Sequence, residues 1–156
     1  MRRALYAQLT ALTCALAAAP ALAAADQSSG PTTPPRASLD GFICKRASDA
    51  LDRVIAVVGV MRPVTGTQRM EMRFVLQRRA AGGTSFRPVH GGDLGRWREP
   101  NPATLGQNSN DMWRLRKLVA NLPGPATYRF RVSFRWLGAS SVLSGSTLIS
   151  NTCTEP

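Results

Sequence analysis

The chain has 156 residues, enough for one domain with its own hydrophobic core, and its hydrophobic content of 44% is ordinary for a globular protein. Lysine and arginine number 20 against nine aspartates and glutamates, which gives a net charge of +11, and there is one histidine. This composition leaves few groups for metal or acid–base chemistry, whereas a basic surface attracts acidic polymers. Nearly all the basic residues are arginine, a bias that we attribute first to a GC-rich genome and only second to selection for a partner.

Residues 1–25 have the pattern of a secretory signal peptide. Two arginines precede an alanine- and leucine-rich run, and the small residues after it predict cleavage following Ala23 or Ala25. The run falls short of the ~20 residues that a membrane anchor needs, and it continues past Cys14, which argues against a lipoprotein signal there. No later segment is apolar enough to span a membrane. We therefore expect an exported mature chain that is secreted, periplasmic or at the cell surface.

Residues 26–38 are polar and proline-rich and show no apolar periodicity, which predicts a linker or an N-terminal tail. Glycosylation or a wall-spanning spacer is compatible with the same composition, but the short length favours a plain tail. The folded domain is expected to begin at Leu39 and to occupy residues 39–156.

Cys44 and Cys153 are the only cysteines left after removal of the signal peptide. An even pair in an exported chain predicts a disulfide. The bridge would close nearly the whole domain, for which chain-entropy estimates give roughly 4–5 kcal/mol of stabilisation. The alternatives are two free thiols or a metal site. The metal site is the weaker alternative, because two cysteines and the distant His90 have no ligand spacing.

Short apolar or alternating segments, separated by glycine- and proline-rich turns, predict an all-β chain. We expect strands at 51–61, 70–76, 86–89, 112–119, 128–136 and 141–149, and an irregular stretch over 90–110. The 86–89 strand should lie at a sheet edge, because Pro88 has no N–H to donate. Lys117 falls among the apolar residues of its strand and fits that assignment poorly. Beyond one helical turn near 47–51 there is no helical periodicity, so about seven strands in a β-sandwich are indicated.

Two of these strands alternate most clearly, with large apolar residues on one side and arginines on the other. The apolar sides are formed by Met70, Met72, Phe74, Leu76, Tyr128, Phe130, Val132, Phe134 and Trp136. If the strands are neighbours, one sheet face carries Glu71 as its sole carboxylate together with Arg69, Arg73, Arg129, Arg131 and Arg135. The aromatic residues near these arginines in sequence all belong to the apolar sides.

The run from Leu122 to Val132, LPGPATYRFRV, resembles the L-x-P-G-x-x-Y-x-x-x-V run of fibronectin type III and related immunoglobulin-like domains. The resemblance implies a tyrosine corner, in which Tyr128 opens a strand and its hydroxyl bonds to nearby backbone, with Leu122 as the apolar residue before it. The chain is also similar to small exported bacterial domains of the cell-adhesion-related CARDB kind. Methionine and phenylalanine replace the inward tryptophan of antibody domains, and the cysteine pair is placed differently. An immunoglobulin-like, fibronectin type III-like sandwich is implied, but an antibody-type subclass is not.

Nothing in the sequence predicts catalysis, a metal or a cofactor. His90 is alone in an expected loop, where a solvent-facing role is the simpler interpretation. Asp49 and Asp52 form the one close acidic pair, and nearby basic residues would offset their charge. The glycine-rich run at 90–95 lacks the strand–turn–helix context of a phosphate loop. We therefore expect a protein that is not an enzyme.

Two functions remain open. The first is an interaction or adhesion module whose arginines bind an acidic cell-wall polymer or another surface protein, since the guanidinium fork suits carboxylate and phosphate. The second is a structural or spacer domain without a specific ligand, in which the arginines form a solvated face that discourages edge aggregation. Nucleic acid fits less well, because export removes the usual target and no base-stacking aromatic residue lies among the arginines.

Overall fold

Nine β-strands and one short 3₁₀ helix make up the part of the protein that the structure, a computed structural model, describes: residues 34–156. The predicted signal peptide and most of the predicted linker lie outside the described residues. In chain order the elements are β1 (Ala37–Lys45), η1 (Ala50–Asp52), β2 (Val54–Met61), β3 (Arg69–Ala80), β4 (Arg87–Pro88), β5 (Trp97–Arg98), β6 (Trp113–Ala120), β7 (Ala126–Leu137), β8 (Val142–Ile149) and β9 (Cys153–Glu155).

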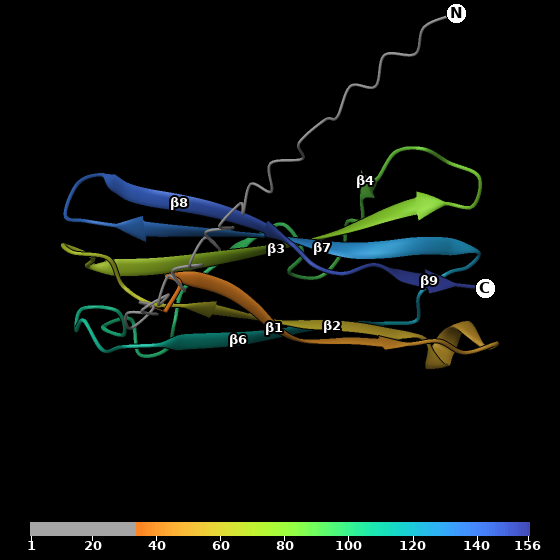
Figure 1. Ribbon diagram of the computed structural model, residues 1–156, viewed down its shortest axis with the longest axis horizontal. Coiled ribbons are helices and arrows are strands. Elements are labelled where there is room, and N and C mark those ends of the chain that lie inside the picture. Colours follow the sequence, from red (N-terminus) through yellow and green to blue (C-terminus); the bar gives the residue numbers. More distant parts are fainter. Residues whose placement is uncertain (1–33) are drawn as a thin grey trace, which may run out of the picture. The chain divides into compact units, whose positions relative to one another are not determined.

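The strands form two antiparallel sheets, which Figure 1 shows as two layers. One sheet has the order β1-β2-β6. The other has the order β4-β3-β7-β8, with β5 also paired to β3 and β9 also paired to β7. The predicted all-β class is confirmed, and the two sheets are compatible with a β-sandwich. β2 is an inner strand and β4 an edge strand, as their sequences predict.

The structure extends the sequence-based assignment at three places. β1 begins at Ala37, two residues inside the predicted linker, where its residues pair with the end of β2. Trp97 and Arg98 form β5 within the stretch expected to be irregular. A final strand, β9, follows β8 and pairs with the start of β7. β5 and β9 are too short to carry a periodic pattern, so the sequence alone does not reveal them.

The core lies on the inward faces of β3 and β7, where the predicted alternation is found. Phe74 and Phe130 contact edge to face, with ring centroids 6.3 Å apart. Their strand neighbours at every second position are also buried. The opposite sheet approaches so closely that a Cβ at Gly59 of β2 would collide with the Met72 sulfur. A larger residue there would require the Met72 side chain to move, which shows how tightly the two sheets pack.

Lys117 lies on the inward side of β6, as the alternation predicts, and an ion pair accounts for its place there. Its ammonium group pairs with the carboxylate of Asp93, from the segment between β4 and β5. This hydrogen bond is the main cause that lowers the pKa of Asp93 below its ordinary value of 3.8. The ion pair links β6, an edge strand of its sheet, to the segment between β4 and β5. Lys117 therefore has a charged partner although it lies among apolar residues.

Within residues 34–156 no helix has the length and apolar character needed to cross a membrane.

Candidate functional site

The predicted arginines meet on one sheet surface because β3 and β7 pair over their whole length. The register places Glu71 opposite Arg135 and Val75 opposite Arg131, all on the side turned away from the core. The condition that these two strands are neighbours in one sheet is therefore met. We name this surface the arginine face and define it by Arg69, Arg73, Arg129, Arg131 and Arg135.

Aromatic rings from another part of the chain lie among these arginines. The guanidinium carbon of Arg73 is 4.6 Å, and that of Arg135 is 4.1 Å, from the centre of the Trp97 ring. Arg129 lies 3.8 Å from the centre of the Phe86 ring. Such cation–π contacts contribute about 0.5–1 kcal/mol each at exposed sites. The expectation that no aromatic residue lies among the arginines is wrong, because the segment after β3 brings both rings to the face.

Two glutamates neutralise one end of the arginine face. Glu71 is 5% exposed, and its carboxylate is bound by the Nε of Arg135 and lies 3.7 Å from the Nε of Arg69. Glu99 lies 3.6 Å from the same Arg69 nitrogen, so the expectation of Glu71 as the sole carboxylate is also wrong. Glu99 follows β5 directly, and the pairing of β5 with β3 brings it to the face.

The other three arginines have no carboxylate partner among the described residues. Arg131 is exposed, whereas Arg73 and Arg129 are half-buried. Arg129 donates from its Nε to the side chain of Gln77 over 2.9 Å. The Nε of Arg73 is buried, and no acceptor in residues 34–156 bonds to it. Stacking on a ring covers one flat side of a guanidinium group and leaves the N–H groups at its edge free to bind an oxyanion.

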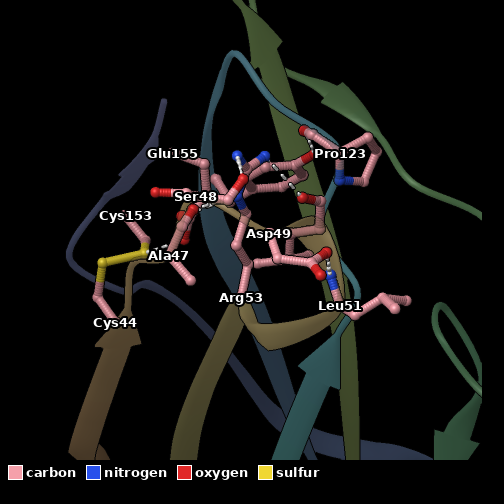
Figure 2. Close-up of polar contacts among 11 residues, drawn as sticks. Cys44, Ala47, Ser48, Asp49, Leu51, Arg53, Pro123, Cys153 and Glu155 are labelled. Carbon is pink, nitrogen blue, oxygen red and sulfur yellow. Dashed lines mark hydrogen bonds and ion pairs between the residues drawn. A yellow bond between two sulfur atoms is a disulfide. The ribbon is translucent and has the colours of Figure 1, made fainter.

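The predicted disulfide is present at the other polar region of the molecule. Cys44 and Cys153 are bonded, with Cα atoms 5.4 Å apart and a sequence separation of 109. Figure 2 shows this bridge beside Arg53 and Glu155, which pair at 3.8 Å although both are almost wholly buried. The bridge ties the end of β1 to β9, and so joins the first strand of one sheet to the last strand of the other.

Backbone carbonyl groups surround Arg53 and satisfy most of its donors. Its Nε donates to Ala47 over 2.7 Å, one terminal nitrogen donates to Ser48 over 2.9 Å, and the other reaches the carbonyl of Leu122 at 3.4 Å (Figure 2). Sequence reasoning missed the pairing with Glu155, because the two residues are far apart in the chain and no local pattern links them.

Tyr128 lies beside this pair at the start of β7. Its side chain is 1% exposed, its hydroxyl donates to the carbonyl of Pro123, and Leu122 is likewise buried. Burial raises the pKa of the Tyr128 phenol, and the neighbouring Arg78 guanidinium opposes that rise. Tyr128 and Leu122, the two residues of the fibronectin-like run, thus lie beside Arg53 and Glu155, which that run does not include. We name this region the closed end and define it by Cys44, Arg53, Leu122, Tyr128, Cys153 and Glu155.

One group of possible metal ligands comes together in the described part of the chain, and it belongs to the closed end. Ligand atoms of Cys44, Cys153 and Glu155 lie within 4.8 Å of one another. Because the two sulfurs are bonded to each other, neither is a thiolate that can bind a metal. Elsewhere, His90 is exposed, Asp49 caps η1 through the Leu51 amide, and Asp52 lies 3.8 Å from Lys45.

Comparisons of the chain with protein-family models, with curated proteins and with solved structures find no match.

Proposed function

We propose that this chain is an exported, non-enzymatic β-sandwich module that binds an acidic cell-surface polymer through its arginine face. The observation that carries the proposal is the group of three arginines without a carboxylate partner in the described part of the chain, Arg73, Arg129 and Arg131, held on two fully paired strands. Export is supported by the signal-peptide pattern and by the disulfide, which fits an oxidising compartment.

The arrangement favours binding because it reduces the conformational entropy that binding would cost. A free arginine side chain loses rotamer freedom when it grips an anion, whereas Arg73 and Arg129 already rest on aromatic rings. Neighbouring like charges on one sheet surface also repel each other, and an anionic chain lying along the face relieves that repulsion. A polymer with regularly spaced carboxylate, phosphate or sulfate groups suits this geometry best.

We also propose that the sandwich is of the immunoglobulin-like, fibronectin type III-like kind. In such folds strands A, B and E share one sheet while C, F and G form the other, and some members add a strand at the C edge. The orders β1-β2-β6 and β4-β3-β7-β8 agree with that plan. The bond from the Tyr128 hydroxyl to Pro123, five residues upstream, agrees with a tyrosine corner. The resemblance to cell-adhesion-related domains adds support for a role in adhesion.

Retention on a heparin resin tests the binding proposal with a matched pair of variants. The first carries Arg73→Gln, Arg129→Gln and Arg131→Gln. The second carries Arg46→Gln, Arg114→Gln and Arg116→Gln, which are exposed positions away from the face. Both variants lose three charges, so a general charge effect lowers their elution salt concentrations equally. We expect the first variant to elute at clearly lower salt than the second, and equal elution would contradict the proposal.

A structural spacer is the second candidate function, and the glutamates at the arginine face favour it. Glu71 and Glu99 already neutralise Arg69 and Arg135, so part of the surface needs no ligand. A spacer predicts that neither variant differs from the wild-type protein in its attachment to cells. Another surface protein as partner instead predicts weak retention on heparin together with face-dependent attachment.

A further inference from the structure

A cleft of about 430 Å³ opens at the side of the sandwich, between β6 and the segment that follows β4. It lies on the core side of β3, whereas the arginine face lies on the other side of that strand. We name it the side cleft. The residues that line it include Leu76, Arg78, Val89, Lys117, Leu122 and Tyr128. A cleft of this size, apolar with a few polar groups, has the character of a small-molecule site.

Arg78 is a charged residue of the side cleft, and the described residues leave one of its donors, the Nε, unused. It faces the interior near the end of β3, opposite Tyr128 in the strand register. Its Nε is buried, and none of residues 34–156 supplies an acceptor for it. A buried guanidinium N–H without an acceptor is costly, so an incoming oxyanion would be stabilised there.

The other charges of the side cleft are already paired. Asp93 is the one carboxylate in its lining, and it binds Lys117 and lies 3.4 Å from Arg98. Arg78 is therefore the cation of the cleft lining that has no carboxylate partner among residues 34–156. An adjoining cleft shares Arg78 and Val89 and adds the exposed Arg87, so the potential near the entrance is positive as well.

We propose that the side cleft binds a small organic anion composed of one carboxylate and an apolar chain. The carboxylate accepts hydrogen bonds from the Arg78 guanidinium, and the apolar chain packs against Leu76, Val89 and Leu122. A small organic cation is repelled by Arg78. A neutral alcohol of the same shape gains the apolar contacts, but its hydroxyl oxygen accepts only an uncharged and weaker hydrogen bond from Arg78. This inference is independent of the proposed binding of polymers at the arginine face.

Three six-carbon probes that differ only in the head group test the proposal: hexanoate, 1-hexanol and hexylamine. Each is titrated into the wild-type protein while backbone amide shifts are followed by NMR. We expect hexanoate to shift the amides of Arg78, Val89 and Leu122, and to bind about tenfold or more tightly than hexanol. Hexylamine is expected not to bind at the cleft. Equal affinity for hexanoate and hexylamine, or hexanoate shifts confined to the arginine face, would overturn the proposal.

Variants of Arg78 locate the anion site. Arg78→Gln is expected to weaken hexanoate binding about tenfold or more, and Arg78→Lys, which keeps the charge, to weaken it less. The matched control is Arg116→Gln, which removes an exposed charge from the outward side of the neighbouring strand β6. It is expected to bind as the wild-type protein does. If Arg78→Gln folds and binds hexanoate as tightly as the wild-type protein, or if Arg116→Gln loses as much affinity as Arg78→Gln, Arg78 is not the anchor.

Discussion

The closed end and the arginine face both place a buried glutamate next to arginine, yet they use arginine differently. Glu155 is 1% and Glu71 is 5% exposed, so the two carboxylates are alike. Arg53 is 7% exposed, directs its donors to backbone carbonyls, and lies 3.8 Å from Glu155. The side chain of Arg69 is 52% exposed and that of Arg135 is 34% exposed, so water and ligands reach both. At these two glutamates, the burial of the guanidinium group, and not that of the carboxylate, separates an arginine closed to solvent from arginines that solvent reaches.

The physical reason is the cost of desolvation. Moving two charges out of water is expensive, and their attraction repays that cost only when geometry and additional hydrogen bonds are good. Arg53 has those additional bonds, whereas at the arginine face solvent screens the charges and their pairing contributes little. Changes at the closed end should therefore reduce stability, and changes at the arginine face should reduce binding.

Loss of the disulfide should have the largest effect on stability. Replacing Cys44 and Cys153 with serine removes a cross-link over 109 positions, which chain-entropy estimates value at about 4–5 kcal/mol. Denaturant unfolding of the wild-type and double-serine proteins measures the difference. Mass spectrometry without reduction checks the premise, since the bridge makes the mature mass two hydrogens lighter. Two thiols that can be alkylated in the freshly exported, native protein would contradict it.

Breaking the buried ion pair should cost nearly as much. Arg53→Met leaves the Glu155 carboxylate buried without a countercharge, for which we expect a loss of about 3–5 kcal/mol in unfolding free energy. The double variant Arg53→Met with Glu155→Leu should recover a large part of that loss. The counterpart at the arginine face is Arg135→Met, with an expected cost of about 1 kcal/mol or less, because Arg69 stays beside Glu71. Equal losses at the two sites would remove the distinction between them.

Removal of the Tyr128 hydroxyl should have a moderate effect. Tyr128→Phe deletes one hydrogen bond to the Pro123 carbonyl, so we expect a loss of about 0.5–1.5 kcal/mol in unfolding free energy. Tyr128→Ala should cost several-fold more, because it also leaves a cavity in the packed interior. Denaturant unfolding provides the measurement. Small and equal effects of the two substitutions would mean that the corner does not stabilise the fold.

The smallest expected effect concerns pH and the Asp93–Lys117 pair. Because the pKa of Asp93 lies below 3.8 in the folded protein, its contribution to stability is complete above that value and is lost as the pH falls through the folded pKa. NMR titration of the carboxyl carbon should give a midpoint below 3.8, and Lys117→Met should move it upward. A midpoint at or above 3.8 in the wild-type protein would show that the pair does not form in solution.

The sequence predicts the parts of the fold that repeat along a strand and misses those that depend on contacts between distant segments. Alternation over many residues predicts β3 and β7 and the side on which each arginine lies, because successive side chains in a strand point to opposite faces. An even number of cysteines in an exported chain predicts the disulfide, because disulfides form and persist in oxidising compartments.

Loop residues and single buried charges were missed because no periodicity marks them. Phe86 and Trp97 reach the arginine face from outside the long strands, and only the pairing of β5 with β3 places Trp97 beside Arg73. Glu155 comes near Arg53 through the pairing of β9, at the end of the sequence, with the start of β7. Lys117 fits the apolar side of its strand poorly by sequence alone, because its partner Asp93 comes from an irregular segment far along the chain.

The most direct test of the central claim is the sedimentation of the protein with isolated bacterial cell walls at increasing salt concentration. We predict saturable binding by the wild-type protein that weakens as salt is added, because screening reduces attraction between exposed charges within about 10 Å. The Arg73, Arg129 and Arg131 variant should lose this binding but still fold, with its unfolding free energy lowered by only about 1–2 kcal/mol through the loss of two cation–π contacts. The Arg46, Arg114 and Arg116 variant should keep most of the binding. Absence of saturable binding by the wild-type protein, or equal loss in the two variants, would contradict the assignment of the arginine face as a binding surface.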